Sequence, residues 1–144
     1  MIQFLLSLAD RARHRARRRF WPVDQAAGRR GEDLAHRYLE RQGLTVVGRN
    51  FRPHSGRGEI DLVAWEGETL VFVEVKSRST AEFGVPDRNV DRVKREALLR
   101  AAFEFTRQAG VPFERVRFDL VSVIFSNPPS LSHVRAAIRP PPRL

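Results

Sequence analysis

The stretch GEIDLVAWEGETLVFVEVKSR, residues 58–78, decides the fold class of this chain. Residues 58–65 and 69–78 are rich in β-branched and aromatic side chains, as expected of strands in the interior of a sheet. Between them, Glu66-Gly67-Glu68 is typical of a short turn. The stretch therefore predicts a central antiparallel hairpin.

This hairpin is predicted to bring two carboxylates and a lysine together. Side chains two positions apart share a face of a strand, so Glu74 and Lys76 lie about 7 Å apart on one face. With a two-residue turn centred on 66–67 or on 67–68, Asp61 lies on that face as well, diagonal to Glu74 or directly opposite it. Either turn places the three side chains within about 5–8 Å of one another. A three-residue turn would separate them.

Two adjacent carboxylates on a largely apolar hairpin need a positive charge, because like charges repel and burial removes their hydration. Lys76 could supply it in a structural ion network, and a divalent cation could supply it in a metal site. The chain has no cysteine, and these strands contain no histidine. Hard carboxylate oxygens then favour Mg²⁺ or Mn²⁺ over zinc. We expect the metal site.

The flanking sequence completes an α/β domain. Gly43 and Gly110 follow helical patterns and are suited to end helices. The expected elements are helices over 26–42 and 91–109, strands over 44–51 and 116–125, and a short further strand around 133–138. The order αβββαβ predicts a mixed sheet flanked by helices, in which the strands on either side of the second helix run parallel.

Three parts are expected along the chain: a basic amphipathic helix over 1–22, a globular domain over 26–139 and a Pro-rich tail over 140–144. Residues 1–20 contain six arginines and one aspartate, with apolar residues at helical spacing. Three roles stay open for this helix: a phosphate-binding arm, a membrane-surface segment, or an extension packed on its own domain.

Composition narrows the functional classes. The chain has 144 residues, the size of one domain, and 42% of them are hydrophobic, enough for a core. The absence of cysteine excludes disulfide scaffolds, thiolate zinc sites and iron–sulfur clusters. There is no apolar run of about 18 residues, and the basic residues near the start follow the apolar ones, unlike in a secretory signal. We expect a cytoplasmic protein.

The charge balance predicts a polyanionic partner. The chain carries 26 basic and 17 acidic residues, a formal net charge of +9, which favours nucleic acid first and an anionic membrane surface second. Only Lys76 and Lys94 are lysine, and every other basic residue is arginine. Two lysines in so arginine-rich a chain indicate chemistry for which a planar guanidinium is unsuited.

The first helix adds a third carboxylate. Helical spacing places Glu32 at the edge of the apolar face, whereas Asp33 is expected to point toward Arg37 and Glu40. An acid in the first turn also suits the helix dipole, so spacing alone does not assign Glu32 to the site. Three histidines lack ligand spacing and are expected on the surface or in loops: His36, His54 and His133.

Several motifs that occur in order resemble the YraN-like family of bacterial proteins. They are 28–33 (GRRGED), 57–63 (RGEIDLV), 70–78 (LVFVEVKSR), the segment from Val90 to Lys94, and 117–121 (RFDLV). The likeness covers about residues 26–125. This family in turn resembles the PD-(D/E)XK nucleases near archaeal Holliday-junction resolvases, whose restriction-endonuclease-like core has the order αβββαβ.

The resemblance implies metal-dependent phosphodiester hydrolysis in nucleic acid, DNA more than RNA, with branched DNA among the substrates. It implies that Asp61, Glu74 and the carbonyl of Val75 hold Mg²⁺ or Mn²⁺. Glu32 would hold a metal-bound water or help a second ion. Lys76 would orient the water or stabilise charge on the phosphate. Because resolvases act as symmetric dimers, a homodimer is implied as well.

Basic residues near the predicted site are candidates for phosphate contacts. They flank strand ends or lie in the N-terminal turns of the helices: Arg29, Arg30, Arg52, Arg57, Arg78, Arg92, Lys94 and Arg95. Two other functions stay open. One is a catalytically silent nucleic-acid-binding module with this fold, and the other is a structural or partner-binding domain whose acids form salt bridges.

Overall fold

The computed structural model of the chain describes residues 23–54, 56, 58–79 and 92–140. The helix predicted over 1–22, the candidate phosphate contact Arg57 and residues 141–144 of the predicted tail lie outside the described residues. Within the described ranges, no helix is both long enough and apolar enough to cross a membrane.

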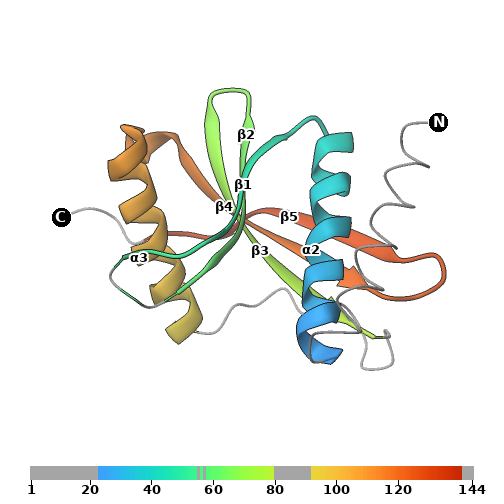
Figure 1. Cartoon of the computed structure of the whole chain (residues 1–144). Coiled ribbons are helices and arrows are strands. Elements are labelled where there is room, and N and C mark those ends of the chain that lie inside the picture. Colours follow the sequence, from blue (N-terminus) through green and yellow to red (C-terminus); the bar gives the residue numbers. More distant parts are fainter. Residues whose placement is uncertain (1–22, 55, 57, 80–91, 141–144) are drawn as a thin grey trace.

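Five strands form one mixed sheet that lies between two helices (Figure 1). The elements are α2 (Val23–Arg41), β1 (Thr45–Phe51), β2 (Ile60–Glu66), β3 (Thr69–Arg78), α3 (Arg92–Ala109), a short 3₁₀ turn η1 (Phe113–Arg115), β4 (Val116–Ile124) and β5 (Ser130–Ile138). The strands lie in chain order across the sheet. Only β3 and β4 are parallel, and the connection between them contains α3. The predicted α/β class is confirmed, and the arrangement matches a restriction-endonuclease-like core.

The last strand is longer than the sequence predicts. β5 spans Ser130–Ile138 rather than 133–138, and its first half pairs with the end of β4, where Val123 lies opposite Leu131. Ser130 and Ser132 are polar and follow a proline-rich turn, so the sequence pattern does not mark the start of this strand.

Each face of the sheet carries its own core. On one face, buried side chains of α3 such as Leu98 pack with Phe72 and Phe118, whose rings stack 5.6 Å apart. On the other face, Ala35 and Leu39 of α2 pack against the alternate residues of β2, β3 and β4. Because β3 is covered on both faces, residues 70–73 are all fully buried, which explains its continuous apolar sequence.

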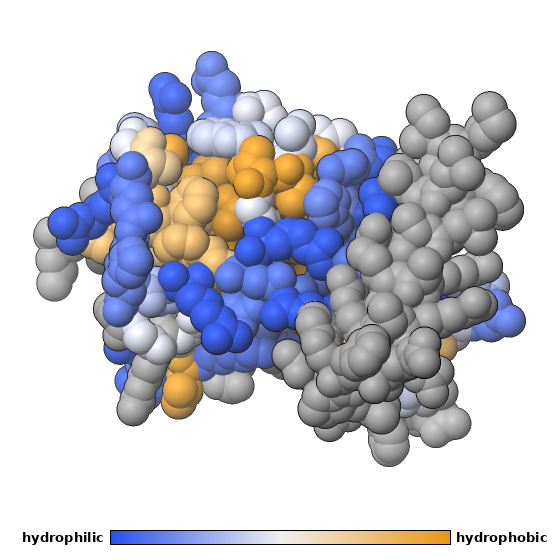
Figure 2. Space-filling model, in the orientation of Figure 1, coloured by the Kyte–Doolittle hydropathy of each residue, from blue (hydrophilic) through white to orange (hydrophobic). Residues whose placement is uncertain are grey.

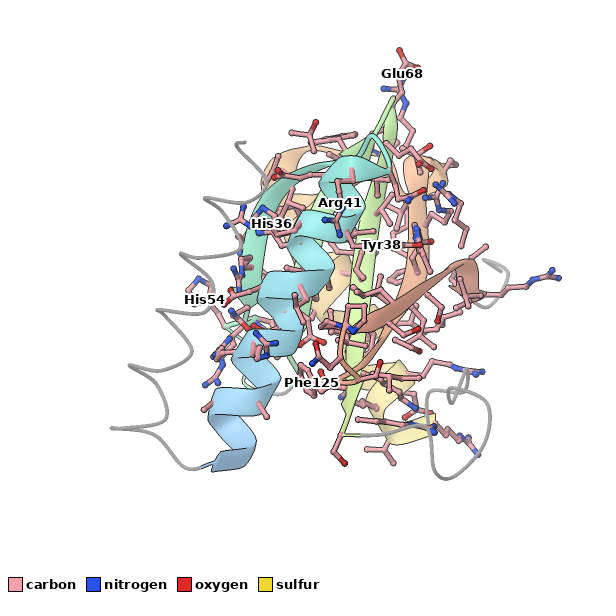
Figure 3. All side chains as sticks on the ribbon, turned by 90° about the vertical axis from the view of Figure 1, so that its right-hand side faces the viewer. His36, Tyr38, Arg41, His54, Glu68 and Phe125 are labelled. Carbon is pink, nitrogen blue, oxygen red and sulfur yellow. The ribbon has the colours of Figure 1, made fainter. Side chains whose placement is uncertain are left out.

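The edge of the sheet formed by β1 lies between the two helices. Val47 in this strand is 53% exposed. In the space-filling view, an apolar area lies between the helices and is bordered by hydrophilic residues (Figure 2). At the tip of the β2–β3 hairpin, Glu68 projects away from the body of the domain (Figure 3).

Helix α2 approaches β3 closely at Gly31. A Cβ atom at this position would lie 2.0 Å from Oγ and 3.2 Å from Cβ of Ser77. Gly28, one turn earlier, would meet no atom within 4 Å. The missing side chain at Gly31 therefore allows the helix turn that carries Glu32 to lie directly on β3.

We expect Gly31→Ala to lower the free energy of unfolding by about 1–3 kcal/mol, because the added methyl group must displace Ser77 or the helix. Gly28→Ala is the matched control and should raise it by up to about 1 kcal/mol, because alanine favours the helix. Urea unfolding monitored by circular dichroism measures both. Equal effects of the two substitutions would contradict the role given to the close approach.

A buried charge cluster joins β4 to β5. Asp119 is fully buried and accepts hydrogen bonds from Nε and Nη2 of Arg117 at 2.8 and 2.9 Å, from Nε2 of His133 at 2.7 Å and from the backbone N–H of Ala136 at 3.0 Å. Burial alone would raise the pKa of Asp119, but these hydrogen bonds hold it below its usual range. The expectation that His133 lies on the surface or in a loop is wrong, because it lies in β5 with a side chain only 3% exposed.

Asp119→Ala should lower the free energy of unfolding by about 3 kcal/mol or more, because it removes the buried acceptor of the hydrogen bonds from Arg117, His133 and the N–H of Ala136. Glu66→Gln is the control: Glu66 also pairs with Arg117, at 2.8 Å, but its side chain is 28% exposed. Glu66→Gln should lower the free energy of unfolding by less than about 1 kcal/mol. Chemical denaturation at neutral pH compares them, and similar small losses would show that the Asp119 cluster adds little stability.

Candidate functional site

The candidate site begins where β2 and β3 separate. Their ladder ends with Leu62 opposite Val73, a register that corresponds to the predicted two-residue turn centred on 67–68. Continuing this register by one residue places Asp61 opposite Glu74. Here the backbone N–H of Val75 donates to Oδ2 of Asp61 at 2.8 Å. The carboxylate of Asp61 thus accepts the hydrogen bond from Val75 in place of a backbone carbonyl of the neighbouring strand. This bond fixes Asp61 at the opening.

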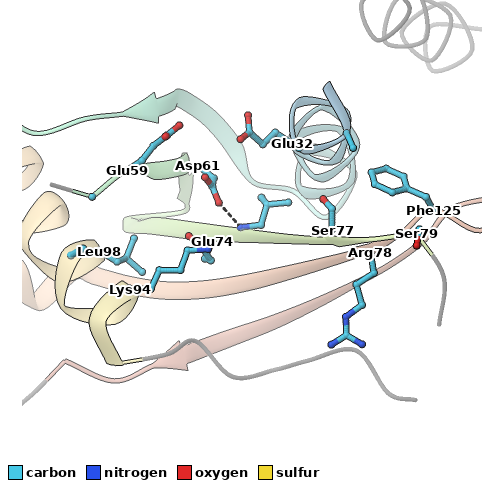
Figure 4. Close-up of a pocket in the computed structure, with 15 residues that line it drawn as sticks. Glu32, Glu59, Asp61, Glu74, Ser77, Arg78, Ser79, Lys94, Leu98 and Phe125 are labelled. Atoms are coloured by element: carbon cyan, nitrogen blue, oxygen red, sulfur yellow. Dashed lines mark hydrogen bonds and ion pairs between the residues drawn. The ribbon is translucent and has the colours of Figure 1, made fainter. Parts of the chain in front are cut away.

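Four carboxylates converge on a pocket of about 780 Å³ at this opening (Figure 4). Glu32 comes from α2, Glu59 from the position just before β2, Asp61 from the start of β2, and Glu74 from β3. Ligand oxygens of Glu32, Glu59 and Asp61 all lie within 4.8 Å of one another. Val75 also lines the pocket. The fold therefore gathers acids that are far apart in the sequence into one small space.

Asp61 is the carboxyl of the pocket whose charged form is least compensated. Burial, the charge of Glu74 and the charge of Glu32 raise the pKa of Asp61 to about 8, although the hydrogen bond from Val75 acts in the opposite direction. Among the residues that the structure describes, Asp61 makes no ion pair. Binding a cation at this position would relieve the repulsion.

The other acids of the pocket have basic partners. Nη1 of Arg29 lies 3.0 Å from Glu32 and 3.8 Å from Glu59. The ammonium of Lys94 lies 2.5 Å from Oε1 of Glu74. These pairs hold the carboxylates of α2 and β3 in place around Asp61.

Asp33 faces the sheet, and the expectation that it points toward Arg37 and Glu40 is wrong. Its side chain is 1% exposed, and Nη2 of Arg49 in β1 lies 2.7 Å from its Oδ1. The same nitrogen lies 3.6 Å from Glu32. Two consecutive acids of α2 therefore attach the helix to β1 through one guanidinium, which helical spacing alone does not reveal.

The residues predicted to hold a metal line the same pocket: Asp61, Glu74, Val75 and Glu32. The two lysines lie differently. Lys76 is half-buried farther along β3, opposite Ser122 of β4, and is not among the lining residues. Lys94, which the sequence singled out as one of two lysines and as a candidate phosphate contact, lines the pocket from α3.

The predicted phosphate contacts divide between two regions. Those that line the pocket or pair with its acids are Arg29, Arg52, Arg78 and Lys94. The guanidinium of Arg30 lies 5.6 Å from the ring centre of Phe125, which itself lines the pocket. By contrast, Arg92 and Arg95 line a separate hollow together with Arg139.

Residues 31–123 match the model of a family described as Uncharacterised protein family UPF0102. The chain belongs to the UPF0102 family. A UPF0102 protein of Solibacter usitatus is 51% identical over 92% of this chain and 99% of its own length. UPF0102 proteins of Rhodococcus jostii and Geobacter sulfurreducens are 44% and 42% identical over 78% and 76% of this chain, and over 95% and 86% of their own lengths. The family to which the sequence motifs pointed is confirmed, and the UPF0102 match contains all four pocket acids.

Sequence reasoning missed Glu59 and the pairing of Lys94 with Glu74. A signal for Glu59 was present, because it lies two positions before Asp61 in an extended segment and so shares its side. No such signal exists for Lys94, whose distance from Glu74 depends on how α3 packs on the sheet.

The raised pKa of Asp61 has a consequence for stability. An aspartate in an unfolded chain titrates near about pH 4, whereas the pKa of Asp61 is raised to about 8. Between these values the folded protein binds a proton that the unfolded chain does not, so the free energy of unfolding falls as pH rises through this window. Asp61→Asn should lack this fall. Its free energy of unfolding should therefore rise relative to that of the parent as pH increases, by up to about 1.4 kcal/mol for each unit by which the pKa of Asp61 is raised.

Urea unfolding of both proteins in a chelator, from about pH 5 to about pH 8, measures the difference. Glu68→Gln, which removes a carboxyl from the exposed hairpin tip, is the control and should follow the parent at every pH. A constant offset between Asp61→Asn and the parent would contradict the raised pKa.

Proposed function

We propose that this UPF0102 protein is a metal-dependent endonuclease, which hydrolyses phosphodiester bonds in nucleic acid. DNA is the favoured substrate, including branched DNA. The observation that carries the proposal is the convergence of Glu32, Glu59, Asp61 and Glu74 on one pocket at the opening of the β2–β3 ladder. The likeness of the motifs to PD-(D/E)XK nucleases supports it, and a homodimer belongs to the same proposal.

The chemistry of the donors suits Mg²⁺ or Mn²⁺. The acidic residues that line the pocket offer hard carboxylate oxygens, and none of the described lining residues is a histidine. Asp61, Glu74 and the carbonyl of Val75 would hold the cation, and Glu32 would hold a bound water or help a second ion. When bound, such a cation supplies Lewis acidity toward a phosphate oxygen and makes a bound water more acidic.

The chain's own groups prepare this pocket for an anionic substrate. The N–H of Val75 fixes Asp61, and Arg29 fixes Glu32. Arg78 and Lys94 place positive charge at the lining, where they could contact a phosphodiester. In this proposal, Lys76 would orient a water molecule or stabilise charge on the phosphate, as the resemblance implies.

The overall charge supports the same function. A formal charge of +9 attracts a polyanion, whereas four clustered carboxylates repel one. A bound cation reconciles the two, because it converts the acidic pocket into a place where a phosphate is stabilised.

A structural role for the acids is the second candidate function, and one observation favours it. Arg29 and Lys94 already neutralise part of the charge on Glu32 and Glu74. In that case the pocket would be a salt-bridge network, and a divalent cation would not stabilise the protein.

Thermal melting and cleavage together test the proposal. Mg²⁺ or Mn²⁺ should raise the melting temperature of the parent, because a ligand that binds only the folded state stabilises it. The panel for cleavage comprises linear, nicked, flap and four-way-junction DNA, plus RNA. Asp61→Asn and Glu74→Gln should lose the metal-induced stabilisation and slow cleavage by about a hundredfold or more.

Glu68→Gln is the control for both measurements, since Glu68 lies at the exposed hairpin tip. Cleavage that persists in both pocket variants would come from a contaminant. Destabilisation by Glu74→Gln, which breaks the ion pair with Lys94, without any metal dependence in the parent would favour the salt-bridge network instead.

A further inference from the structure

Lys94 reaches the pocket from the opposite side to Glu32. It extends from α3 toward Glu74, and its Nζ contacts Oε1 at 2.5 Å (Figure 4). The carboxylate of Glu74 is 3% exposed, whereas the lysine side chain is 54% exposed. A half-exposed cation thus pairs with a buried anion that the proposed function assigns to a metal ion.

The packing of α3 determines where this lysine lies. Leu98, one turn after Lys94, is buried in the core on that face of the sheet. A Cβ atom at Gly58 would lie only 2.7 Å from the carbonyl oxygen of Ala97, so the segment leading into β2 contacts the helix backbone directly. These contacts set the helix turn that carries Lys94 above the opening between β2 and β3.

We propose that Lys94 is the resident counter-ion of the acidic pocket. Its ammonium neutralises Glu74 while no divalent cation is bound, and a divalent cation displaces it. The inference rests on the proposed function, because it requires that Glu74 binds a cation. Lysine suits this role, since its ammonium is a point charge on a flexible stem, whereas the guanidinium of arginine forms bidentate pairs of fixed geometry.

Two consequences follow from the displacement. Lys94 competes with the cation for Glu74, so it weakens cation binding and sets the concentration at which the pocket fills. The displaced ammonium stays beside the pocket, where it can contact a phosphate of the nucleic acid. Filling the pocket would therefore release a positive charge to the substrate.

The sign of the effect on metal affinity separates this role from a structural one. If Lys94 only held Glu74 in position, removing it would weaken cation binding. If Lys94 competes with the cation, removing it tightens binding, because one positive charge close to the site is gone.

Isothermal titration calorimetry with Mg²⁺, on the full chain at low ionic strength, measures this sign. Lys94→Gln should bind Mg²⁺ roughly tenfold more tightly than the parent. Lys94→Arg keeps the charge and should bind Mg²⁺ no more tightly than the parent, because a guanidinium can hold Glu74 in a bidentate pair. Arg100→Gln removes one charge from an exposed position of the same helix and is the control. At saturating Mg²⁺, Lys94→Gln should cleave the preferred substrate roughly tenfold more slowly or worse, because the phosphate contact is lost.

Unchanged or weaker Mg²⁺ binding by Lys94→Gln, with normal binding by the parent, would overturn the inference and leave the proposed function standing. Tighter binding with undiminished cleavage would overturn the contact with phosphate. If the parent itself binds no Mg²⁺, the proposed function fails. A melting curve of each variant in chelator confirms that it is folded.

Discussion

The hydrogen bond from the N–H of Val75 to Asp61 is the contact on which the pocket depends. Two neighbouring strands normally stay paired along their shared length, because each buried backbone N–H needs an acceptor. Here a side-chain carboxylate becomes that acceptor, so β2 can leave β3 without leaving Val75 unpaired. The same bond holds Asp61 near Glu74, where burial and like charge raise its pKa. One hydrogen bond thus explains both the opening in the sheet and the repulsion between the carboxylates of the pocket.

The two helices complete the pocket from opposite faces of the sheet. Gly31 allows α2 to lie close to β3, which brings Glu32 to the opening. On the other face, the core around Leu98 holds α3 so that Lys94 reaches Glu74. The result is an acidic centre with basic residues at its lining, within a chain whose net charge is strongly positive. That distribution is the one that the proposed metal-dependent function requires.

Local patterns predicted the element order and the convergence of Asp61 with Glu74. Either two-residue turn gave the same face, so the prediction did not depend on which turn forms, and the structure has the one centred on 67–68. The errors concern contacts between distant segments. Asp33 is buried because Arg49 lies across from it, and His133 because Asp119 accepts its hydrogen bond. Neither partner is visible from the spacing of residues within one element.

Because each face of the sheet has its own core, the geometry of the pocket depends on two separate helix–sheet interfaces. Glu32 keeps its position only while α2 stays docked, and Lys94 only while α3 does. Partial detachment of either helix would leave the five-stranded ladder intact and still dismantle the acidic centre. Local opening thus threatens the chemistry of the pocket well before it threatens the fold.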